Sequence, residues 1–228
     1  MDLSSDKFSR LLAIYDFSQM EKLKDAKVAV VGLGGVGSYC SLALARSCVG
    51  TLKIVDFDTV DVSNINRQLF ANDKTVGKFK ADVAENMIFD VNPDIKVVKV
   101  KESLTSENAS KILSDVDYIV DAIDDVPGKI EIAKFAQEND ILLVSCMGTA
   151  LRTDPFKFQF ADIYKTSVCP LCRKVRKLAK ENRIKKLNVL YSKEPAVKSL
   201  NGKLGSTSFV PPIAGFMLAS KVIEDLVS

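Results

Sequence analysis

The sequence predicts an α/β fold with a doubly wound, Rossmann-like and mostly parallel sheet and a C-terminal extension. Short apolar runs alternate with longer helical patterns, a glycine-rich turn follows an early run, and two later runs end in acidic residues. Alternation of strand and helix implies buried parallel strands joined by right-handed crossovers. The 228 residues suffice for one domain with a sizeable core.

The expected elements follow from hydrophobic periodicity and from glycine and proline positions. Strands are expected at 26–32, 51–58, 95–100, 117–125, 141–145 and 155–162. Helices are expected at 8–23, 36–50, 77–93, 105–113, 128–138 and 170–182. A final apolar helix is expected to start near Pro211, since proline is tolerated in a first helical turn.

Composition excludes several classes of protein. No apolar stretch reaches the length of about 18 residues needed to span a membrane, and residues 1–10 lack the apolar run of a secretory signal. Five cysteines, an odd number, indicate free thiols and a cytoplasmic protein. Histidine is absent, which removes the commonest general base and metal ligand. The chemistry must therefore use carboxylates, amines, guanidinium groups, backbone dipoles or a metal carried by the substrate.

The charge is distributed unevenly along the chain. Residues 165–203 hold twelve Lys/Arg and two acids, a local charge of +10, whereas the remainder carries −7. A basic block on a mildly acidic body suggests a polyanionic partner. The alternative is a solvated helical face.

The turn after the first expected strand predicts a nucleotide site. Gly32, Gly34 and Gly37 have the G-x-G-x-x-G spacing, with Gly35 in the same loop, between a strand and a helix. Such glycines let backbone N–H groups approach phosphate at a helix N-terminus. Asp56, 24 residues after Gly32, ends the second strand and is expected to accept hydrogen bonds from ribose hydroxyls.

A dehydrogenase would explain the glycines but not the segment that follows Asp56. Two cations and two amides in this part of the chain fit a triphosphate better than a dinucleotide. They are Asn64, Arg67, Gln68 and Lys80, with Lys78 as a further lysine. Asp121 and Asp124 end another strand at the same edge, where carboxylates suit Mg²⁺ that bridges acid and phosphate.

The string GxGGxG…DxD…NxxRQ…VGxxK…DxxD resembles the adenylyltransferase superfamily that activates ubiquitin-like proteins and sulfur carriers, from about residue 8 to 148. The resemblance implies ATP and Mg²⁺ as ligands and a homodimer. It assigns catalytic roles to Arg10, Arg67, Lys80 and Asp124, with Arg10 as an arginine finger reaching ATP in the other subunit and Asp124 holding magnesium. It assigns nucleotide contacts to Gly32, Gly34, Gly35, Gly37, Asp56, Asp58, Asn64, Gln68 and Asp121.

Simpler interpretations exist for several of these residues. Lys78 is equally well a surface lysine. Asp58, Asp61 and Asp125 fit strand-end or helix-capping acids. Arg10 could pair with a neighbouring acid.

Members of this superfamily adenylate a carboxylate, and the second half of the chain indicates which carboxylate this protein would adenylate. Carrier-activating relatives commonly hold a structural zinc with two CxxC pairs, but here only Cys169 and Cys172 form such a pair, so a zinc site within the chain is not expected. Either cysteine is a candidate reactive thiol or an ordinary loop residue. The alternative function is activation of the C-terminal glycine of a ubiquitin-like sulfur-carrier protein.

Residues 147–167 and 205–226 resemble the tRNA threonylcarbamoyladenosine dehydratase branch, which extends the resemblance to nearly the whole chain. That branch adenylates the threonyl carboxylate of a modified adenosine and cyclises it with release of AMP, so tRNA is the implied partner. Sulfur-relay proteins are possible further partners. The CxxC pair and a short tail depart from the pattern. Candidate RNA-binding residues are Arg173, Lys174, Arg176, Lys177, Lys180, Arg183, Lys185 and Lys186.

These observations predict one domain over 1–228. Residues 1–148 would form the ATP-binding core, 149–206 a basic crossover and RNA-binding segment, and 207–228 the C-terminal helix.

Overall fold

A computed structural model describes residues 1–3 and 5–228 and contains a seven-stranded sheet. The strand order is β3-β2-β1-β4-β5-β7-β6, parallel except for the antiparallel β6–β7 pair. The strands are β1 (Lys27–Val31), β2 (Thr51–Val55), β3 (Lys96–Val100), β4 (Tyr118–Asp121), β5 (Leu142–Cys146), β6 (Phe158–Asp162) and β7 (Asn188–Ser192). The expected doubly wound, mostly parallel α/β fold is confirmed.

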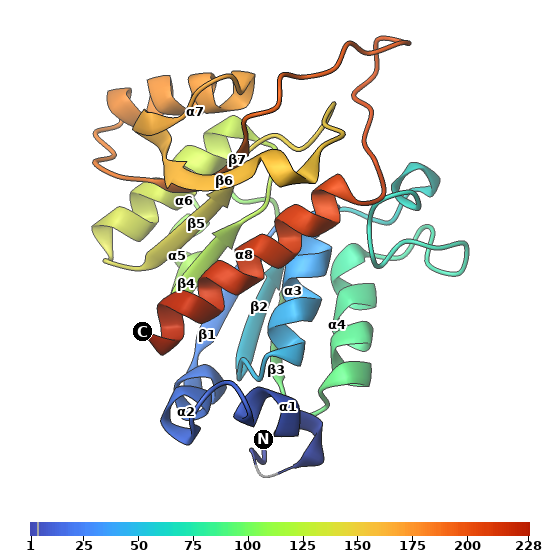
Figure 1. The fold of residues 1–228 in the computed structure, drawn as a ribbon, viewed down its shortest axis with the longest axis vertical. Helices are drawn as coiled ribbons and strands as arrows, with labels where there is room; N and C mark the ends of the chain where they lie inside the picture. Colours follow the sequence, from blue (N-terminus) through green and yellow to red (C-terminus); the bar gives the residue numbers. More distant parts are fainter. Residues whose placement is uncertain (4) are drawn as a thin grey trace.

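Helices cover both faces of the sheet (Figure 1). The α-helices are α1 (Ser9–Leu12), α2 (Phe17–Asp25), α3 (Gly37–Arg46), α4 (Lys80–Val91), α5 (Ala109–Leu113), α6 (Val126–Glu138), α7 (Pro170–Glu181) and α8 (Val210–Val227). Four short 3-10 helices are Asp6–Phe8, Val62–Asn64, Pro155–Lys157 and Ile163–Lys165. Helices α3, α4 and α8 pack on one face, whereas α5, α6 and α7 contribute to the clusters on the other.

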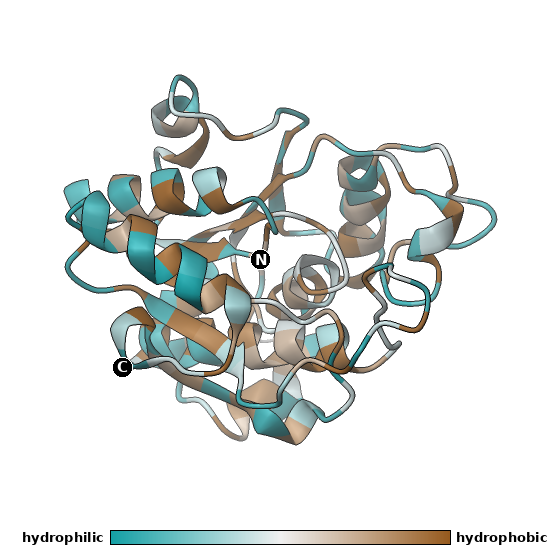
Figure 2. Cartoon of the chain, turned by 90° about the horizontal axis from the view of Figure 1, so that it is seen from above, coloured by the Kyte–Doolittle hydropathy of each residue, from teal (hydrophilic) through white to brown (hydrophobic). Residues whose placement is uncertain are grey.

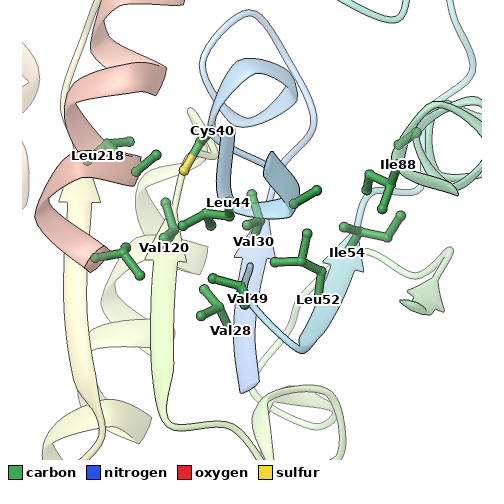
Figure 3. Close-up of a cluster of buried hydrophobic side chains, with 14 of the residues drawn as sticks. Val28, Val30, Cys40, Leu44, Val49, Leu52, Ile54, Ile88, Val120 and Leu218 are labelled. Carbon is green, nitrogen blue, oxygen red and sulfur yellow. The ribbon is translucent and has the colours of Figure 1, made fainter. Parts of the chain in front are cut away.

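The alternation of side chains along β1 separates these two faces. Val28 and Val30 join the cluster under α3 and α8, whereas Ala29 and Val31 join the cluster under α5 and α6. Figure 3 shows Val28 and Val30 beside Leu44 of α3. Because both faces are covered, the central strands are largely apolar, as the sequence predicted.

The N-terminal region differs from the expected single helix over 8–23. The chain forms α1 and then restarts as α2, because Asp16 begins a new helix. Its side chain accepts a hydrogen bond from the backbone N–H of Gln19 at 2.9 Å, and the Gln19 side chain accepts one from the Asp16 N–H at 3.1 Å. This reciprocal capping box stabilises a helix start inside an otherwise continuous apolar pattern. The prediction of one helix was wrong.

Two further elements depart from expectation. Strand β7 was not predicted, because it lies inside the basic segment; it pairs with β5 and β6. The segment 149–206 therefore extends the same sheet. The helix expected at 105–113 begins only at Ala109, after a turn in which the Asn108 side chain accepts a hydrogen bond from the Thr105 N–H at 2.7 Å.

Figure 2 shows hydrophilic residues over much of the outer loops and helix turns. Within the described part of the chain, no helix combines the length and the apolar character that crossing a membrane requires.

Helix α8 packs against α3 at a glycine, which gives a stability prediction. A Cβ atom at Gly215 would lie 2.4 Å from the Val36 carbonyl oxygen and 3.0 Å from the Tyr39 Cβ. Replacement of glycine by alanine in a free helix stabilises it by about 1 kcal/mol. Here we expect Gly215→Ala to destabilise the protein by about 1–3 kcal/mol because the two helices must separate. In thermal unfolding, the melting temperature should fall by about 2–4 °C for each kcal/mol of stability lost.

The matched control is Gly205→Ala, where an added Cβ finds its nearest neighbour at an ordinary 3.8 Å. Its melting temperature should stay close to that of the wild type. A Gly215→Ala protein that is as stable as the control would contradict the packing argument.

Candidate nucleotide-binding site

The glycine loop lies between β1 and α3, at the carboxyl edge of the sheet. Gly32 has φ +91°, and a Cβ atom there would lie 2.8 Å from the Ala122 carbonyl oxygen. A Cβ atom at Gly37 would lie 1.8 Å from the Gly32 carbonyl oxygen. Only glycine permits this path against the end of β4. No side chain caps the first turn of α3, and apart from the Ser38 N–H, which donates to the Gly34 carbonyl oxygen at 3.1 Å, its N–H groups are available to an anion.

Asp56 joins the glycine loop to the end of β2. Its carboxylate accepts the Leu33 N–H at 2.6 Å and the Asp58 N–H at 2.9 Å. Burial raises the pKa of Asp56 above its ordinary value, and the charge of Lys80 and the two backbone hydrogen bonds oppose that rise. The acid predicted to contact ribose is therefore held against the loop predicted to contact phosphate.

The segment after Asp56 returns to the glycine loop. A Cβ atom at Gly34 would lie 3.9 Å from the Gln68 side-chain nitrogen, and one at Gly35 would lie 3.3 Å from the Arg67 carbonyl oxygen. The structure thus brings both predicted residues beside the loop. Asn64 is buried and accepts a hydrogen bond from the Asp61 N–H at 3.1 Å, which forms a capping box around Val62–Asn64.

The two predicted cations, Lys80 and Arg67, differ in their contacts. Lys80 is buried at the start of α4, and its ammonium group lies 2.7 Å from an Asp58 oxygen. The Arg67 guanidinium donates to the Ser63 carbonyl oxygen at 2.8 Å and to the Asn66 side chain at 3.0 Å. Lys78, by contrast, is exposed.

Asp121 has a different environment from the one expected. Its side chain is 1% exposed and forms an ion pair of 3.0 Å with Lys129, which is itself fully buried. It also accepts the Ser145 hydroxyl and the Ile123 N–H. Because the carboxylate is almost completely buried and is paired with a buried lysine, this geometry does not support the predicted nucleotide contact by Asp121. The sequence pattern could not show this, because the partners come from α6 and β5.

The two acids that follow have separate positions. Asp125 caps α6 by accepting the Gly128 N–H at 2.7 Å. Asp124 is exposed in the loop between β4 and α6, and across residues 1–3 and 5–228 its carboxylate has no hydrogen bond or ion pair. Of the predicted metal-binding and nucleotide-binding acids after β4, Asp124 is the one with both oxygens available.

Arg10 is not brought to these residues within one chain. It is exposed on α1, at the end of the sheet where the strands begin, whereas the glycine loop lies at the opposite end (Figure 1). Any contact between Arg10 and a nucleotide would therefore involve a second copy of the chain.

The basic segment forms α7 and the turn after it. Seven of its eight candidate residues are exposed: Arg173, Lys174, Lys177, Lys180, Arg183, Lys185 and Lys186. Arg176 is the exception, since its guanidinium donates to the Thr166 carbonyl oxygen and hydroxyl, both at 2.8 Å. Arg176 therefore differs from the other seven candidates, because it is half-buried and its side chain ties α7 to the preceding loop.

Helix α7 lies beside the loop that carries Asp124. A hollow of about 390 Å³ is lined by Val126 and Pro127 of α6 and by Lys174, Lys177 and Leu178 of α7. These α6 residues follow Asp124 almost directly in sequence. The basic surface and the free carboxylate are therefore neighbours.

Sequence reasoning missed two buried cations near this edge. Lys129 donates to Asp121 and, at 2.7 Å, to the Cys146 carbonyl oxygen, which ties α6 to β4 and β5. Arg152, in the loop after β5, is 3% exposed, and its Nε has no partner among the described residues. The sequence offered only weak signals for these residues: Lys129 lies next to the apolar face of a helix, and Arg152 lies shortly after a strand.

The buried ion pair gives a second prediction. Lys129→Met leaves the Asp121 charge buried without its cation, which should destabilise the protein by about 3–5 kcal/mol in urea unfolding. On the same helix, Lys134 forms a partly exposed pair with Glu131 at 3.2 Å. Lys134→Met should therefore cost about 1 kcal/mol or less.

Removing both charges distinguishes loss of the pair from loss of packing. We expect Lys129→Met combined with Asp121→Leu to be more stable than Lys129→Met alone, because no unpaired buried charge is left. A Lys129→Met protein as stable as the Lys134→Met control would show that the ion pair does not hold this edge together.

Comparisons with known proteins identify the family of this chain. Residues 8–227 match the model of the ThiF family. The tRNA threonylcarbamoyladenosine dehydratases of Bacillus subtilis and Haemophilus influenzae are 38% and 31% identical to this chain; the alignments cover 96% and 99% of this chain and 94% and 95% of theirs.

Solved structures with the same fold include enzymes of the same name. The crystal structure of the E. coli tRNA N6-threonylcarbamoyladenosine dehydratase TcdA in complex with ATP has a TM-score of 0.91 at 30% identity, with 97% of this chain and 96% of that chain covered. Its complex with AMP has a TM-score of 0.93 at 30% identity, with 99% and 97% covered. The resemblance found in the sequence is confirmed, and the chain belongs to the ThiF family.

Proposed function

We propose that this protein is an ATP-dependent tRNA threonylcarbamoyladenosine dehydratase of the cytoplasm. The observation that carries the proposal is the contact between α6 and α7, which sets a basic surface beside the free carboxylate of Asp124. A tRNA bound along α7 would then present its modified adenosine to the nucleotide edge. Similarity to dehydratases over nearly the whole chain supports the same function.

ATP would lie along the carboxyl edge between β1 and β4, where the direction of the strand order reverses. The N–H groups of the glycine loop and the first turn of α3 would receive phosphate, and Asp56 would receive the ribose. Arg67, Gln68 and Lys80 surround the loop from the β2–α4 side and would contact the triphosphate. Asp58 pairs with Lys80 and keeps the lysine aimed at this edge.

The donor set also fits magnesium. Mg²⁺ usually takes one or two protein carboxylates and completes its shell with water and substrate phosphates. Asp124 offers one such carboxylate, and no cluster of three acids, cysteines or histidines occurs in the described chain. When bound there, the ion would neutralise charge on the phosphates.

The reaction then needs few groups from the protein. A threonyl carboxylate oxygen attacks the α-phosphorus of ATP in line, and pyrophosphate leaves with its charge stabilised by Arg67 and Lys80. The carbamoyl group of the same nucleoside next attacks the acyl adenylate and closes a ring, and AMP leaves with the carboxylate oxygen. The net change in the nucleoside is the loss of one water.

We further propose a homodimer in which Arg10 of each subunit reaches the ATP of the other. Its exposure and its distance from the glycine loop of its own chain support this arrangement. Sulfur-relay proteins stay a proposed class of further partner.

The test of the function is incubation with ATP, Mg²⁺ and tRNA that bears threonylcarbamoyladenosine, followed by mass spectrometry of the nucleosides. The modified nucleoside should lose about 18 Da. Arg67→Ala and Lys80→Ala should each lower the rate about a hundredfold or more, because each removes a cation from the leaving pyrophosphate. Lys78→Ala, which removes a neighbouring exposed lysine, should keep wild-type turnover.

An unchanged nucleoside mass, with an enzyme that still binds ATP, would overturn the proposal. Equal losses of turnover in the Lys78 and Lys80 variants would instead contradict the specific role given to Lys80.

The basic surface gives a separate prediction. Lys177→Glu combined with Lys180→Glu should weaken tRNA binding and lower the slope of log affinity against log salt by about 2, roughly one per lost phosphate contact. The control replaces Lys96 and Lys111, which are exposed on β3 and α5, by glutamate. Binding titrations over a range of salt concentrations measure the tRNA affinity and its salt dependence for each variant. If the α7 variant binds like the control, α7 is only a solvated face.

A further inference from the structure

Arg152 is a buried cation that has no part in the reaction as described so far. It lies in the loop that follows β5 and is 3% exposed. Its one hydrogen bond within residues 1–3 and 5–228 runs from Nη1 to the Leu151 carbonyl oxygen at a long 3.4 Å, and it forms no ion pair with any residue of those ranges. A buried charge without a partner lowers stability, so its presence points to a ligand.

The unpaired edge of this guanidinium has the shape that a carboxylate requires. Nε is fully enclosed and has no hydrogen-bond partner among the described residues. Nη2 makes no hydrogen bond with them either, but it is not enclosed, so it is the atom that a ligand can reach. The Nε–H and Nη2–H bonds of arginine project from one edge of a planar group, and this pair of donors matches the two oxygens of a carboxylate.

A second unpartnered donor lies in the segment that contacts this loop. The Ser206 hydroxyl is enclosed and has no hydrogen-bond partner among the described residues. The preceding residue, Gly205, accepts the Leu151 N–H at 2.9 Å, so Arg152 and Ser206 each follow a member of one bonded pair. Three side-chain atoms of the described chain are enclosed without a partner, and two of them belong to Arg152 and Ser206.

The segment that carries Ser206 also contacts the nucleotide-binding site. The Ser206 carbonyl oxygen accepts a hydrogen bond from the side-chain amide of Asn66, next to Arg67, at 3.1 Å. Figure 1 shows this segment, in red, descending beside the loop that precedes α4. Further along, a Cβ atom at Gly35 would lie 3.0 Å from the Pro211 Cβ, so the start of α8 touches the glycine loop. The segment thus joins the loop after β5 to the nucleotide site.

The acid that contacts the loop of Arg152 is already engaged. Glu194 accepts the Thr153 N–H at 3.0 Å, the Thr153 hydroxyl at 2.8 Å and the Asp154 N–H at 3.1 Å. Both of its carboxylate oxygens are used in these bonds, and neither forms an ion pair with Arg152. The guanidinium is therefore not held as half of an internal salt bridge.

We propose that Arg152, assisted by Ser206, binds the threonyl carboxylate of the modified adenosine, an inference that rests on the proposed function. Nε–H and Nη2–H would each hold one carboxylate oxygen, and the Ser206 hydroxyl would donate to one of them. A carboxylate has about four acceptor positions, so three hydrogen bonds leave a lone pair to attack the α-phosphorus. The phosphates have cations of their own in Arg67 and Lys80, which leaves Arg152 for the acceptor.

A ligand-binding role and a structural role predict different stabilities. Arg152→Met keeps most of the apolar stem and removes a charge that has no partner, so its melting temperature should equal or exceed that of the wild type. The matched control is Lys157→Met, which replaces an exposed cation of the same loop. A melting temperature of Arg152→Met well below that of the control would show a structural residue and would overturn the proposal.

The deciding measurement compares two tRNAs that differ in one carboxylate. One bears threonylcarbamoyladenosine and the other bears its methyl ester, which is uncharged. Titrations without ATP give the ratio of the two affinities, in which the contacts to the RNA backbone cancel. The wild type and Lys157→Met should prefer the acid by about ten- to a hundredfold, the effect of hydrogen bonds to a charged group. Arg152→Met should bring the ratio close to one.

Arg152→Lys provides a second variant, because it keeps the charge but lacks the planar pair of donors. It should also lower the preference for the acid, and it decides the question if Arg152→Met does not fold. A wild-type ratio in both variants overturns the proposal, as does a loss of ATP affinity with the ratio unchanged, which would assign Arg152 to a phosphate. The proposed function itself fails only if the wild type leaves the modified nucleoside unchanged in the presence of ATP and Mg²⁺.

Discussion

The close approach of the glycine loop to the end of β4 is the constraint on which the site depends. Gly32 lies against the Ala122 carbonyl and Gly37 against Gly32 itself, so the loop is pressed into the position where the strand order reverses. Asp56 then reaches the Leu33 N–H, and Arg67 and Gln68 reach the outside of the loop. Any side chain at Gly32 or Gly37 would move the loop away from all of these partners.

Much of this arrangement could be predicted because its signals are local. Apolar strands, the glycine spacing and the strand-end acids are read within a few residues of one another. The restart at Asp16 was missed because a capping box interrupts a continuous apolar pattern without glycine or proline. Strand β7 was missed because charged residues surround its five residues, and its partners β5 and β6 come from other parts of the chain.

The environments of the acids depend on tertiary contacts, so residue type and strand position alone could not distinguish Asp121 from Asp124, and only the family resemblance assigned magnesium to Asp124. Both follow the same apolar run, and both suit magnesium by residue type. Lys129 and Ser145 enclose Asp121, and Asp124 is left open, so burial decides between them. The sequence likewise could not separate Arg176 from the exposed basic residues of α7, since its partner Thr166 precedes the helix and gives no signal in the sequence.

The absence of histidine is consistent with a reaction whose nucleophile needs no base. A carboxylate with an ordinary pKa near 4 is already ionised at neutral pH, so adenylation requires orientation and cations rather than proton removal. In the proposed function, amides at the start of α3 would orient the nucleotide, Arg67 and Lys80 would supply the cations, and Asp124 would offer a free acid to magnesium. Because α7 lies beside that acid, the proposal gives RNA affinity to lysines that take no part in the bond-making steps. The proposed function thus places substrate recognition and catalysis on separate parts of this fold, which is why substitutions on α7 and at the β2–α4 segment are expected to affect different measurements.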